Sequence, residues 1–236
     1  MSIVKFIRPC ALTFISRQEV APDTYTFSFK PNAPLAWQAG QHGLIELKSA
    51  KGKIIRRMFS LSSSPSEEIV SITTRYIGHA ASDFKKSLWA LKPGDKAKLR
   101  GPVGPMYVNN PKQHNVFIAS GIGITPFRSV LVEATANKQD LHGTLIYENS
   151  NNTAIFKDEI EKLSTNLKHL EVKLITEPEK LTEETIRLSV SDLGSSMFYL
   201  AGSPPTIKRY KKFLSQLGVK RSQIKNDPFR GYKYES

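Results

Sequence analysis

The sequence predicts an antiparallel β-barrel followed by an α/β domain with a parallel sheet, and two observations support this prediction. The first part of the chain has short apolar or alternating runs broken by Gly and Pro, which is typical of a small antiparallel barrel. After Pro111, apolar runs alternate with segments of helical spacing, as in parallel sheets covered on both faces. With 236 residues, the chain has room for two domains of ordinary size. We expect a first domain of residues 1–108 and a second domain of residues 109–236.

The first domain is expected to consist mainly of strands, over residues 24–29, 44–47 and 69–72. One helix is expected over residues 81–91, because its apolar side chains fall on one face at helical spacing. This helix would cover one end of the barrel.

The second domain is expected to alternate strands with helices. The strands are expected at residues 116–119, 143–147, 170–175 and 197–200, and the helices at residues 126–135, 155–164, 183–190 and 204–217. This order predicts a parallel sheet whose ligands bind outside the carboxyl ends of its strands.

Composition excludes several kinds of protein and site. Hydrophobic residues make up 39% of the chain, and no apolar run approaches the roughly 18 residues of a membrane-spanning helix. No secretory signal is recognisable, so we expect no membrane span and a cytoplasmic location. The single cysteine, Cys10, excludes a disulfide framework, an all-thiolate zinc site and an iron–sulfur cluster held by this chain's own thiolates. We assign no metal ligand, and redox chemistry here needs another carrier.

The net charge of +13 indicates an acidic partner. Residues 1–110 and 208–236 are basic, whereas residues 111–207 are mildly acidic. Nucleic acid, an anionic membrane surface and an acidic protein would all be attracted by this charge. The densest basic run, residues 208–212, is typical of the solvated face of an amphipathic helix. Because no zinc-finger or RNP-type pattern is present, we expect no nucleic-acid partner.

Two glycine-containing turns follow expected strands of the second domain. In Gly121–Pro126 (GIGITP), the glycines permit a tight turn, Thr125 can cap the next helix and Pro126 suits its first position. Ala201–Pro204 (AGSP) repeats the arrangement, with Ser203 as the cap. Unpaired N–H groups at such turns suit a pyrophosphate or a carboxamide. One turn alone is as well explained by tight packing, but two at one sheet edge predict a nucleotide site.

A third motif, Arg57–Ser60 (RMFS), lies in the first domain. Alternation along a strand would put Arg57 and Phe59 on one face and Met58 and Ser60 on the other. The cation and the ring would then contact different parts of one flat, phosphate-bearing ligand. By itself, the motif also fits an ordinary half-exposed strand.

Together, these motifs resemble those of the ferredoxin–NADP reductase family. Arg57–Ser60 resembles its RxYS flavin motif, Gly121–Pro126 its GxGITP nicotinamide motif, Ala201–Pro204 its CGxP motif and Gly101–Gly104 its GPxG segment. The motifs occur in the family's order over nearly the whole chain. The resemblance implies a flavin-binding barrel and a nicotinamide-nucleotide-binding α/β domain. It also implies FAD as the cofactor, with FMN as an alternative, and NADH or NADPH as the co-substrate, with hydride passing from nicotinamide C4 to flavin N5.

The resemblance further implies which residues form the site. Arg57 would pair with the flavin phosphate, Phe59 would pack on the flavin, and Ser60 and Thr125 would lie beside the reacting atoms as catalytic residues. Further cofactor contacts are expected from Met58, Thr74, Tyr76, Gly78, Ala81, Ser82, Gly121, Gly123, Ile124, Pro126, Glu148, Gly202, Ser203, Pro204 and Tyr232.

Three positions depart from the family pattern. Phe59 replaces the usual tyrosine, as in flavin reductases that use flavin as a dissociable substrate. Ala201 replaces a cysteine beside the nicotinamide, so we expect slower hydride transfer or altered positioning. Glu148 follows the second α/β strand, where many NADP-dependent relatives carry arginine. Its carboxylate can accept bonds from a ribose 2′-hydroxyl and would repel a 2′-phosphate, which favours NADH.

The tail resembles the FxGY ending of many bacterial members, through Phe229 and Tyr232. In relatives, a C-terminal aromatic residue can cover the flavin face where nicotinamide enters. Alternatively, these two rings anchor the last strand, and both interpretations stay open.

We therefore expect an NAD(P)H-dependent flavoenzyme that reduces a separate acidic carrier such as ferredoxin or flavodoxin, with the basic charge as a docking field. The alternative is a flavin reductase that releases reduced flavin, which Phe59 supports. A basic binding module without chemistry is the third hypothesis, and the presence of Arg57, Gly121 and Gly123 argues against it.

Overall fold

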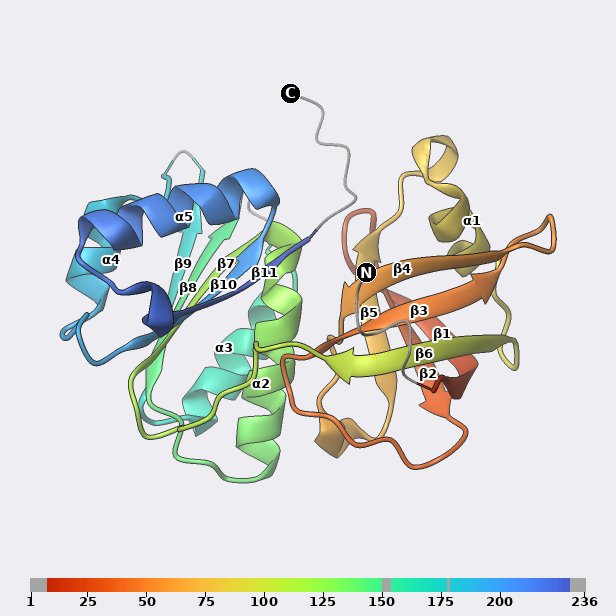
Figure 1. Cartoon of the computed structure of the whole chain (residues 1–236), viewed down its shortest axis with the longest axis horizontal. Helices are drawn as coiled ribbons and strands as arrows, with labels where there is room; N and C mark the ends of the chain where they lie inside the picture. Colours follow the sequence, from red (N-terminus) through yellow and green to blue (C-terminus); the bar gives the residue numbers. More distant parts are fainter. Residues whose placement is uncertain (1–7, 150–153, 178, 230–236) are drawn as a thin grey trace.

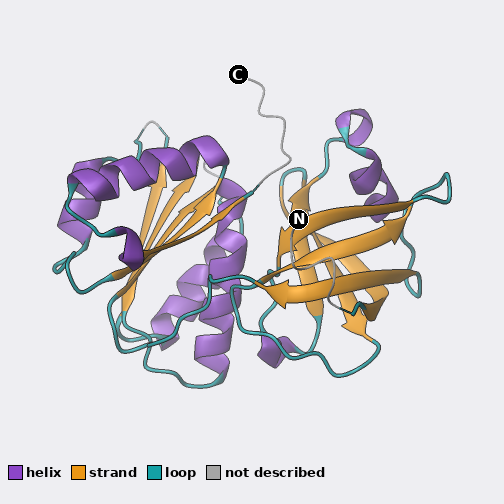
Figure 2. Ribbon diagram, in the orientation of Figure 1, coloured by secondary structure: helices purple, strands orange, loops and turns teal. Residues whose placement is uncertain are grey.

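The protein has two sheets, one in each half of the chain. The computed structural model describes residues 8–149, 154–177 and 179–229. The first sheet is a curled antiparallel half-barrel and the second is parallel, with helices on both of its faces (Figures 1 and 2). The predicted fold class is thereby confirmed.

The half-barrel sheet has the strand order β4-β3-β6-β1-β2-β5, with antiparallel pairing between neighbours. Its strands are β1 (Cys10–Ala21), β2 (Thr24–Pro31), β3 (His42–Lys48), β4 (Ile54–Ser60), β5 (Val70–Arg75) and β6 (Lys96–Val103). Helix α1 (Asp83–Trp89) is shorter than predicted, but Phe84 and Leu88 are buried on its inner face as expected. They pack into a core with Phe27, Phe29 and Ile45.

The parallel sheet has the strand order β11-β10-β7-β8-β9. Its strands are β7 (Asn115–Ser120), β8 (Gly143–Asn149), β9 (Leu170–Thr176), β10 (Met197–Gly202) and β11 (Ile224–Pro228). The helices are α2 (Thr125–Ala136), α3 (Lys157–Asn166), α4 (Glu183–Ser189) and α5 (Pro204–Gln216).

Two separate cores hold the helices against the parallel sheet. Helices α2 and α3 cover one face and α4 and α5 the other (Figure 1). Along β7, Phe117 and Ala119 point to the first face, while Val116 and Ile118 point to the second. This alternation explains why the strand reads as one continuous apolar run. None of the described helices is long and apolar enough to cross a bilayer.

The turn after β7 differs from its prediction. A short 3-10 helix, η4 (Gly121–Ile124), is inserted between β7 and α2, so Thr125 is the first residue of α2 and not its cap. Its hydroxyl donates to the carbonyl of Ile122 at 3.1 Å. The second predicted cap is confirmed, because the Ser203 hydroxyl accepts a bond from the Thr206 N–H at 3.2 Å.

Candidate functional site

A cavity of about 450 Å³ lies between the half-barrel and the parallel sheet. The end of β4 forms one wall, the η4–α2 turn a second, and β11 with the residue after it a third. The lining residues are His42, Met58, Phe59, Ser60, Thr73, Ile122, Thr125, Asn226, Asp227, Pro228 and Phe229. Segments far apart in sequence thus share one space, as at ligand sites between domains.

A buried polar network lies at the centre of this cavity. The Ser60 hydroxyl donates to Asp227 Oδ2 at 2.6 Å, and both residues are buried. His42 pairs with Ser60 across β3 and β4, and its Nδ1 lies 3.7 Å from the same carboxylate oxygen. The carboxylate therefore fixes the orientation of the hydroxyl.

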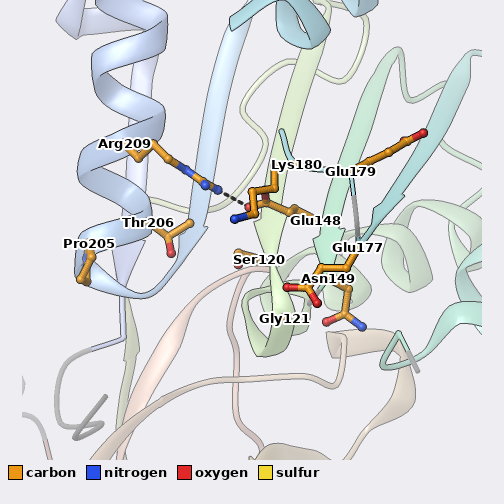
Figure 3. Close-up of a pocket in the computed structure, with 10 residues that line it drawn as sticks. All are labelled: Ser120, Gly121, Glu148, Asn149, Glu177, Glu179, Lys180, Pro205, Thr206 and Arg209. Atoms are coloured by element: carbon orange, nitrogen blue, oxygen red, sulfur yellow. Dashed lines mark hydrogen bonds and ion pairs between the residues drawn. The ribbon is translucent and has the colours of Figure 1, made fainter. Parts of the chain in front are cut away.

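A second cavity, of about 350 Å³, opens at the carboxyl ends of β7 and β8 and at the start of α5 (Figure 3). It is lined by Ser120, Gly121, Glu148, Asn149, Glu177, Glu179, Lys180, Pro205, Thr206 and Arg209. Because Ser120 and Gly121 border this cavity while Ile122 and Thr125 border the first, one turn separates the two. An extended ligand can reach from one cavity to the other along this turn.

Glu148 already accepts three donors inside the second cavity. Its Oε1 accepts the N–H of Leu181 at 2.8 Å, and its Oε2 accepts the Tyr210 hydroxyl at 2.6 Å and an N–H of Arg209. Burial and the neighbouring Glu148 charge raise the pKa of Tyr210, which stays a neutral donor. Arg209 was expected on a solvated helix face, yet it turns into the cavity toward Glu148 (Figure 3).

Both halves of the chain match models of known domains. Residues 11–107 match the oxidoreductase FAD-binding domain, and residues 117–212 match the oxidoreductase NAD-binding domain. The chain belongs to the ferredoxin–NADP reductase family. It is an NAD(P)H-dependent flavoprotein oxidoreductase with FAD as its cofactor, as the resemblance of its motifs implied.

Relatives and solved structures agree with this family. NADH-cytochrome b5 reductase 1 of Coccidioides immitis (strain RS) is 25% identical over 221 residues, which cover 85% of this chain and 71% of the relative. The FAD/NAD-binding domain of nitric oxide dioxygenase from Vibrio cholerae O1 biovar El Tor has a TM-score of 0.81 at 21% identity, over 93% of this chain and 98% of that chain. Ferredoxin-NADP+ reductase from Plasmodium falciparum has a TM-score of 0.77 at 17% identity, over 94% of this chain and 96% of that chain.

The wall formed by β4 fits the flavin of such a reductase. Phe59 offers an aromatic surface and packs on Phe84 with ring centroids 5.6 Å apart. Met58 and Ser60 also line the cavity, so both faces of the end of β4 contribute to it. Ser60 is the last residue of β4, and the cavity lies beyond the strand end, where side chains of both faces reach it.

Cations suited to a diphosphate lie beside this wall. Arg57 is exposed on β4, where its Nη1 donates to the Arg56 carbonyl at 2.9 Å, and it does not line the cavity. Two cations that sequence motifs did not single out are Arg75, which ends β5, and Lys85 in α1. Burial, and to a smaller extent the charge of Arg75, lower the pKa of Lys85. Such a pair attracts a phosphate group.

Five of the residues predicted as cofactor contacts belong to one continuous segment from β5 to α1. Thr74 is buried in β5, Tyr76 stacks on Trp89 with ring centroids 4.2 Å apart, and Ala81 is buried. Gly78 has a φ of +38°, and the Ser82 hydroxyl caps α1 by accepting the Lys85 N–H at 3.4 Å. None of these five residues lines the cavity between the sheets.

Different structural requirements explain why glycine stands at positions 121 and 123, after β7. Gly121 has a φ of +52° and borders the second cavity. At Gly123, a Cβ would come within 2.2 Å of the Ala201 carbonyl oxygen, so close contact with the end of β10 requires the glycine. Packing thus accounts for Gly123 without any ligand.

The remaining predicted residues lie behind the residues that line the two cavities, except Tyr232, which lies outside the described residues. Ile124 and Pro126 are buried in the domain core. Gly202 accepts the Phe229 N–H at 3.0 Å, and Ser203 and Pro204 start α5, whose next residues, Pro205 and Thr206, reach the cavity. Of the two tail aromatics, Phe229 lines the first cavity and Tyr232 lies outside the described residues.

Proposed function

We propose that this reductase takes hydride from a nicotinamide coenzyme at the cavity between its domains and passes electrons to a separate acidic carrier protein. The observation that supports this best is that the hydroxyls of Ser60 and Thr125 line one cavity from opposite domains, next to Phe59. Bound FAD supplies the chemistry, by accepting hydride at N5 and releasing electrons.

Each side chain has a distinct role in the proposal. Phe59 packs on the flavin ring, Ser60 donates a hydrogen bond near flavin N5, and Thr125 positions the nicotinamide. Arg57 binds the flavin phosphate, and the Arg75–Lys85 pair supports it. The Asp227 carboxylate holds the Ser60 hydroxyl in place, and the apolar wall keeps water from the reacting atoms.

The second cavity supports NADH as the preferred coenzyme. Its ionisable lining consists of Glu148, Glu177 and Glu179 against Lys180 and Arg209. Because Arg209 is paired with Glu148, the remaining ionisable lining residues are one cation, Lys180, and two carboxylates, Glu177 and Glu179. A 2′-phosphate would add charge where acidic side chains are already in excess.

An acidic carrier is supported by the basic half-barrel. The chain carries a net charge of +13, and Arg56 and Arg57 are exposed on β4 beside the cavity. Ferredoxin and flavodoxin are the acidic carriers that the family suggests, and the relatives' name adds cytochrome b5. We place this electron transfer in the cytoplasm, where a lone thiol such as Cys10 stays reduced.

A stopped-flow experiment tests the proposal. We expect the purified protein to be yellow, NADH to bleach it anaerobically faster than NADPH, and oxidised ferredoxin, flavodoxin or cytochrome b5 to restore the colour. Reoxidation should slow as ionic strength rises, because salt screens the docking charges. A protein that NADH and NADPH both leave oxidised would contradict the proposal.

The second candidate, a flavin reductase, is favoured by one observation: Phe59 has no hydroxyl to hold the ribityl chain. This candidate predicts that flavin is lost on a desalting column and that turnover then requires added free flavin. Retention of flavin through the column, with turnover that depends on the carrier, would eliminate it.

A further inference from the structure

A cluster of three potential metal ligands lies at the amino ends of β8 and β9, whereas both cavities lie at the carboxyl end of the parallel sheet. His142 directly precedes β8, His169 directly precedes β9, and Asp140 lies two residues before His142. In the ladder between these strands, Gly143 pairs with Leu170, so the two histidines are neighbours on adjacent strands. The seven residues of β8 put about 20 Å between this edge and the nucleotide cavity.

Buried leucines turn the three side chains outward. Leu141 and Leu170 are buried in the domain core. Asp140 is exposed and half-buried His142 lies 3.1 Å from it, so both side chains lie outside the core that contains Leu141.

The backbone of both histidines is fixed by hydrogen bonds. The N–H of His142 donates to the Pro111 carbonyl at 2.8 Å, and its own carbonyl accepts the Asn115 N–H at 3.0 Å. The His169 carbonyl accepts the Gly143 N–H at 2.9 Å. The imidazoles therefore project from fixed positions, so little ordering is needed for them to act together.

The ligand atoms of the three side chains lie close together. Asp140 Oδ1 lies 3.1 Å from His142 Nε2 and 3.7 Å from His169 Nε2, and all the ligand atoms lie within 4.8 Å of one another. The imidazole rings stack with centroids 4.4 Å apart. The in-plane lone pairs of stacked rings do not meet, so the exposed His169 ring has to turn for both Nε2 atoms to bind one ion. Nε2 of His142 is shielded from solvent and has no aligned hydrogen-bond partner among the described residues. Its distance to Asp140 Oδ1 is short enough for an ion pair, so a bound ion would replace this contact.

These distances match the spacing of ligands around zinc. Zn²⁺ binds imidazole nitrogen and carboxylate oxygen at about 2.0–2.2 Å, so two ligands of a tetrahedral ion lie about 3.4 Å apart. The two nitrogens disfavour Ca²⁺ and Mg²⁺, which prefer oxygen ligands. We propose that Asp140, His142 and His169 bind one Zn²⁺ ion, with water completing its coordination.

The zinc site would stabilise the fold and take no part in hydride transfer. The ion would join the loop before β8 to the loop before β9, so binding would favour the folded state over the unfolded chain. The reacting atoms lie at the other end of the strands. Metal binding is therefore expected to raise thermal stability and to leave the rate of flavin reduction unchanged.

Calorimetric titration of the untagged, flavin-loaded full chain with ZnCl₂ tests the proposal. We expect one Zn²⁺ per chain and a higher melting temperature with zinc than with EDTA. His169→Ala and Asp140→Asn change exposed side chains, so both variants should fold; each should weaken zinc binding by about tenfold or more and lose the melting shift. The matched control is Glu161→Gln, which removes an exposed carboxylate paired only with Lys157 on α3 and should bind zinc like the wild type.

Substitution with Co²⁺ adds a spectroscopic measurement. Visible absorption bands of four- or five-coordinate cobalt that appear in the wild type and disappear in His169→Ala would support the site. The proposal would be overturned if the wild type bound no zinc, or if His169→Ala and Asp140→Asn bound it as tightly as the wild type.

Discussion

Asp227 acts on a residue 167 positions away, because its carboxylate accepts the Ser60 hydroxyl at 2.6 Å inside the cavity between the domains. A bond this short to an ionised acceptor is among the stronger hydrogen bonds of proteins. It holds the hydroxyl in one orientation and keeps a negative charge beside His42. The last described strand thereby completes a site whose other wall belongs to the first domain.

Asp227→Asn tests the importance of this bond. The amide keeps the size of the side chain but removes the charge, so Ser60 loses its charged acceptor. We expect flavin reduction by NADH to slow by about tenfold or more, while flavin stays bound, in stopped-flow measurements. Ser60→Ala should cause a similar loss, and the double variant should be little slower than either single variant, because the two residues act as one unit. Wild-type rates in Asp227→Asn would show that the carboxylate has no part in the reaction.

Short motifs contain the information for part of this site and not for the rest. Ser60 and Thr125 were predicted because each lies in a local motif, and both line the cavity. His42 and Asp227 lie in no motif, since their contact exists only after two domains pack together. Arg209 was not predicted to face the cavity for a different reason. The other cations of the basic run, Lys208, Lys211 and Lys212, are exposed, and the turn of α5 directs Arg209 toward Glu148.

At the scale of elements, the predicted strands are those with a clear apolar pattern, and β1 was missed because it lacks one. Only Leu12 and Phe14 are buried in its first half, and residues 15–19 are all exposed. A register shift between Phe14 and Ser16 breaks the alternation further. β11 has a single apolar residue, Ile224, and exists through its pairing with β10. Such strands are specified by their neighbours, which a local pattern does not reveal.

His114 connects the amino ends of three elements of the parallel sheet. It directly precedes β7, and its ring nitrogens lie 3.1 Å from the hydroxyl of Ser196, before β10, and 3.2 Å from that of Thr144 in β8. Burial lowers the pKa of His114; the charge of Glu171 raises it, His142 lowers it and Asp192 raises it, each to a smaller extent. The folded state therefore favours the neutral ring.

The contribution of His114 to stability should consequently be lost as the pH is lowered. Above about pH 6.5, the histidine is neutral in both states, and its contribution is fully present. As the pH falls below that value, the unfolded chain takes up a proton more readily than the folded one, and stability is lost. Urea unfolding at about pH 7.5 and pH 5.5 should show a larger loss for the wild type than for His114→Gln, which cannot titrate. Equal losses would assign the pH dependence to other groups.

At the scale of the whole molecule, α2 joins the two domains through a charged contact. Arg128 donates to Glu67 at 2.9 Å and to the Ser62 carbonyl at 2.7 Å in the first domain, and to Glu159 of α3 at 2.6 Å. The adjacent Ser129 hydroxyl donates to the Ser63 carbonyl at 2.7 Å. Burial opposes the charge on Arg128, but the hydrogen bonds to Glu67 and Glu159 prevail and raise its pKa. Because the FAD-binding and NAD-binding domains are different parts of the chain, we expect this contact to influence how closely the reacting atoms of flavin and nicotinamide approach.

Arg128→Met should therefore reduce both stability and hydride transfer. The apolar side chain keeps most of the volume but leaves two carboxylates and a carbonyl without their donor, and we expect a loss of about 2–3 kcal/mol in the free energy of unfolding. The matched control is Arg187→Met on α4, whose ion pair with Glu184 is more than half exposed on both sides, at 57% and 58%; its loss of stability should be much smaller, because water screens an exposed pair. Urea titration gives the stability, and stopped flow gives the rate at saturating NADH.

A slower rate at saturation in Arg128→Met alone would show that the contact positions the domains for the reaction. If both variants lost equal stability and kept the wild-type rate, the charge on α2 would be no more than an ordinary surface ion pair.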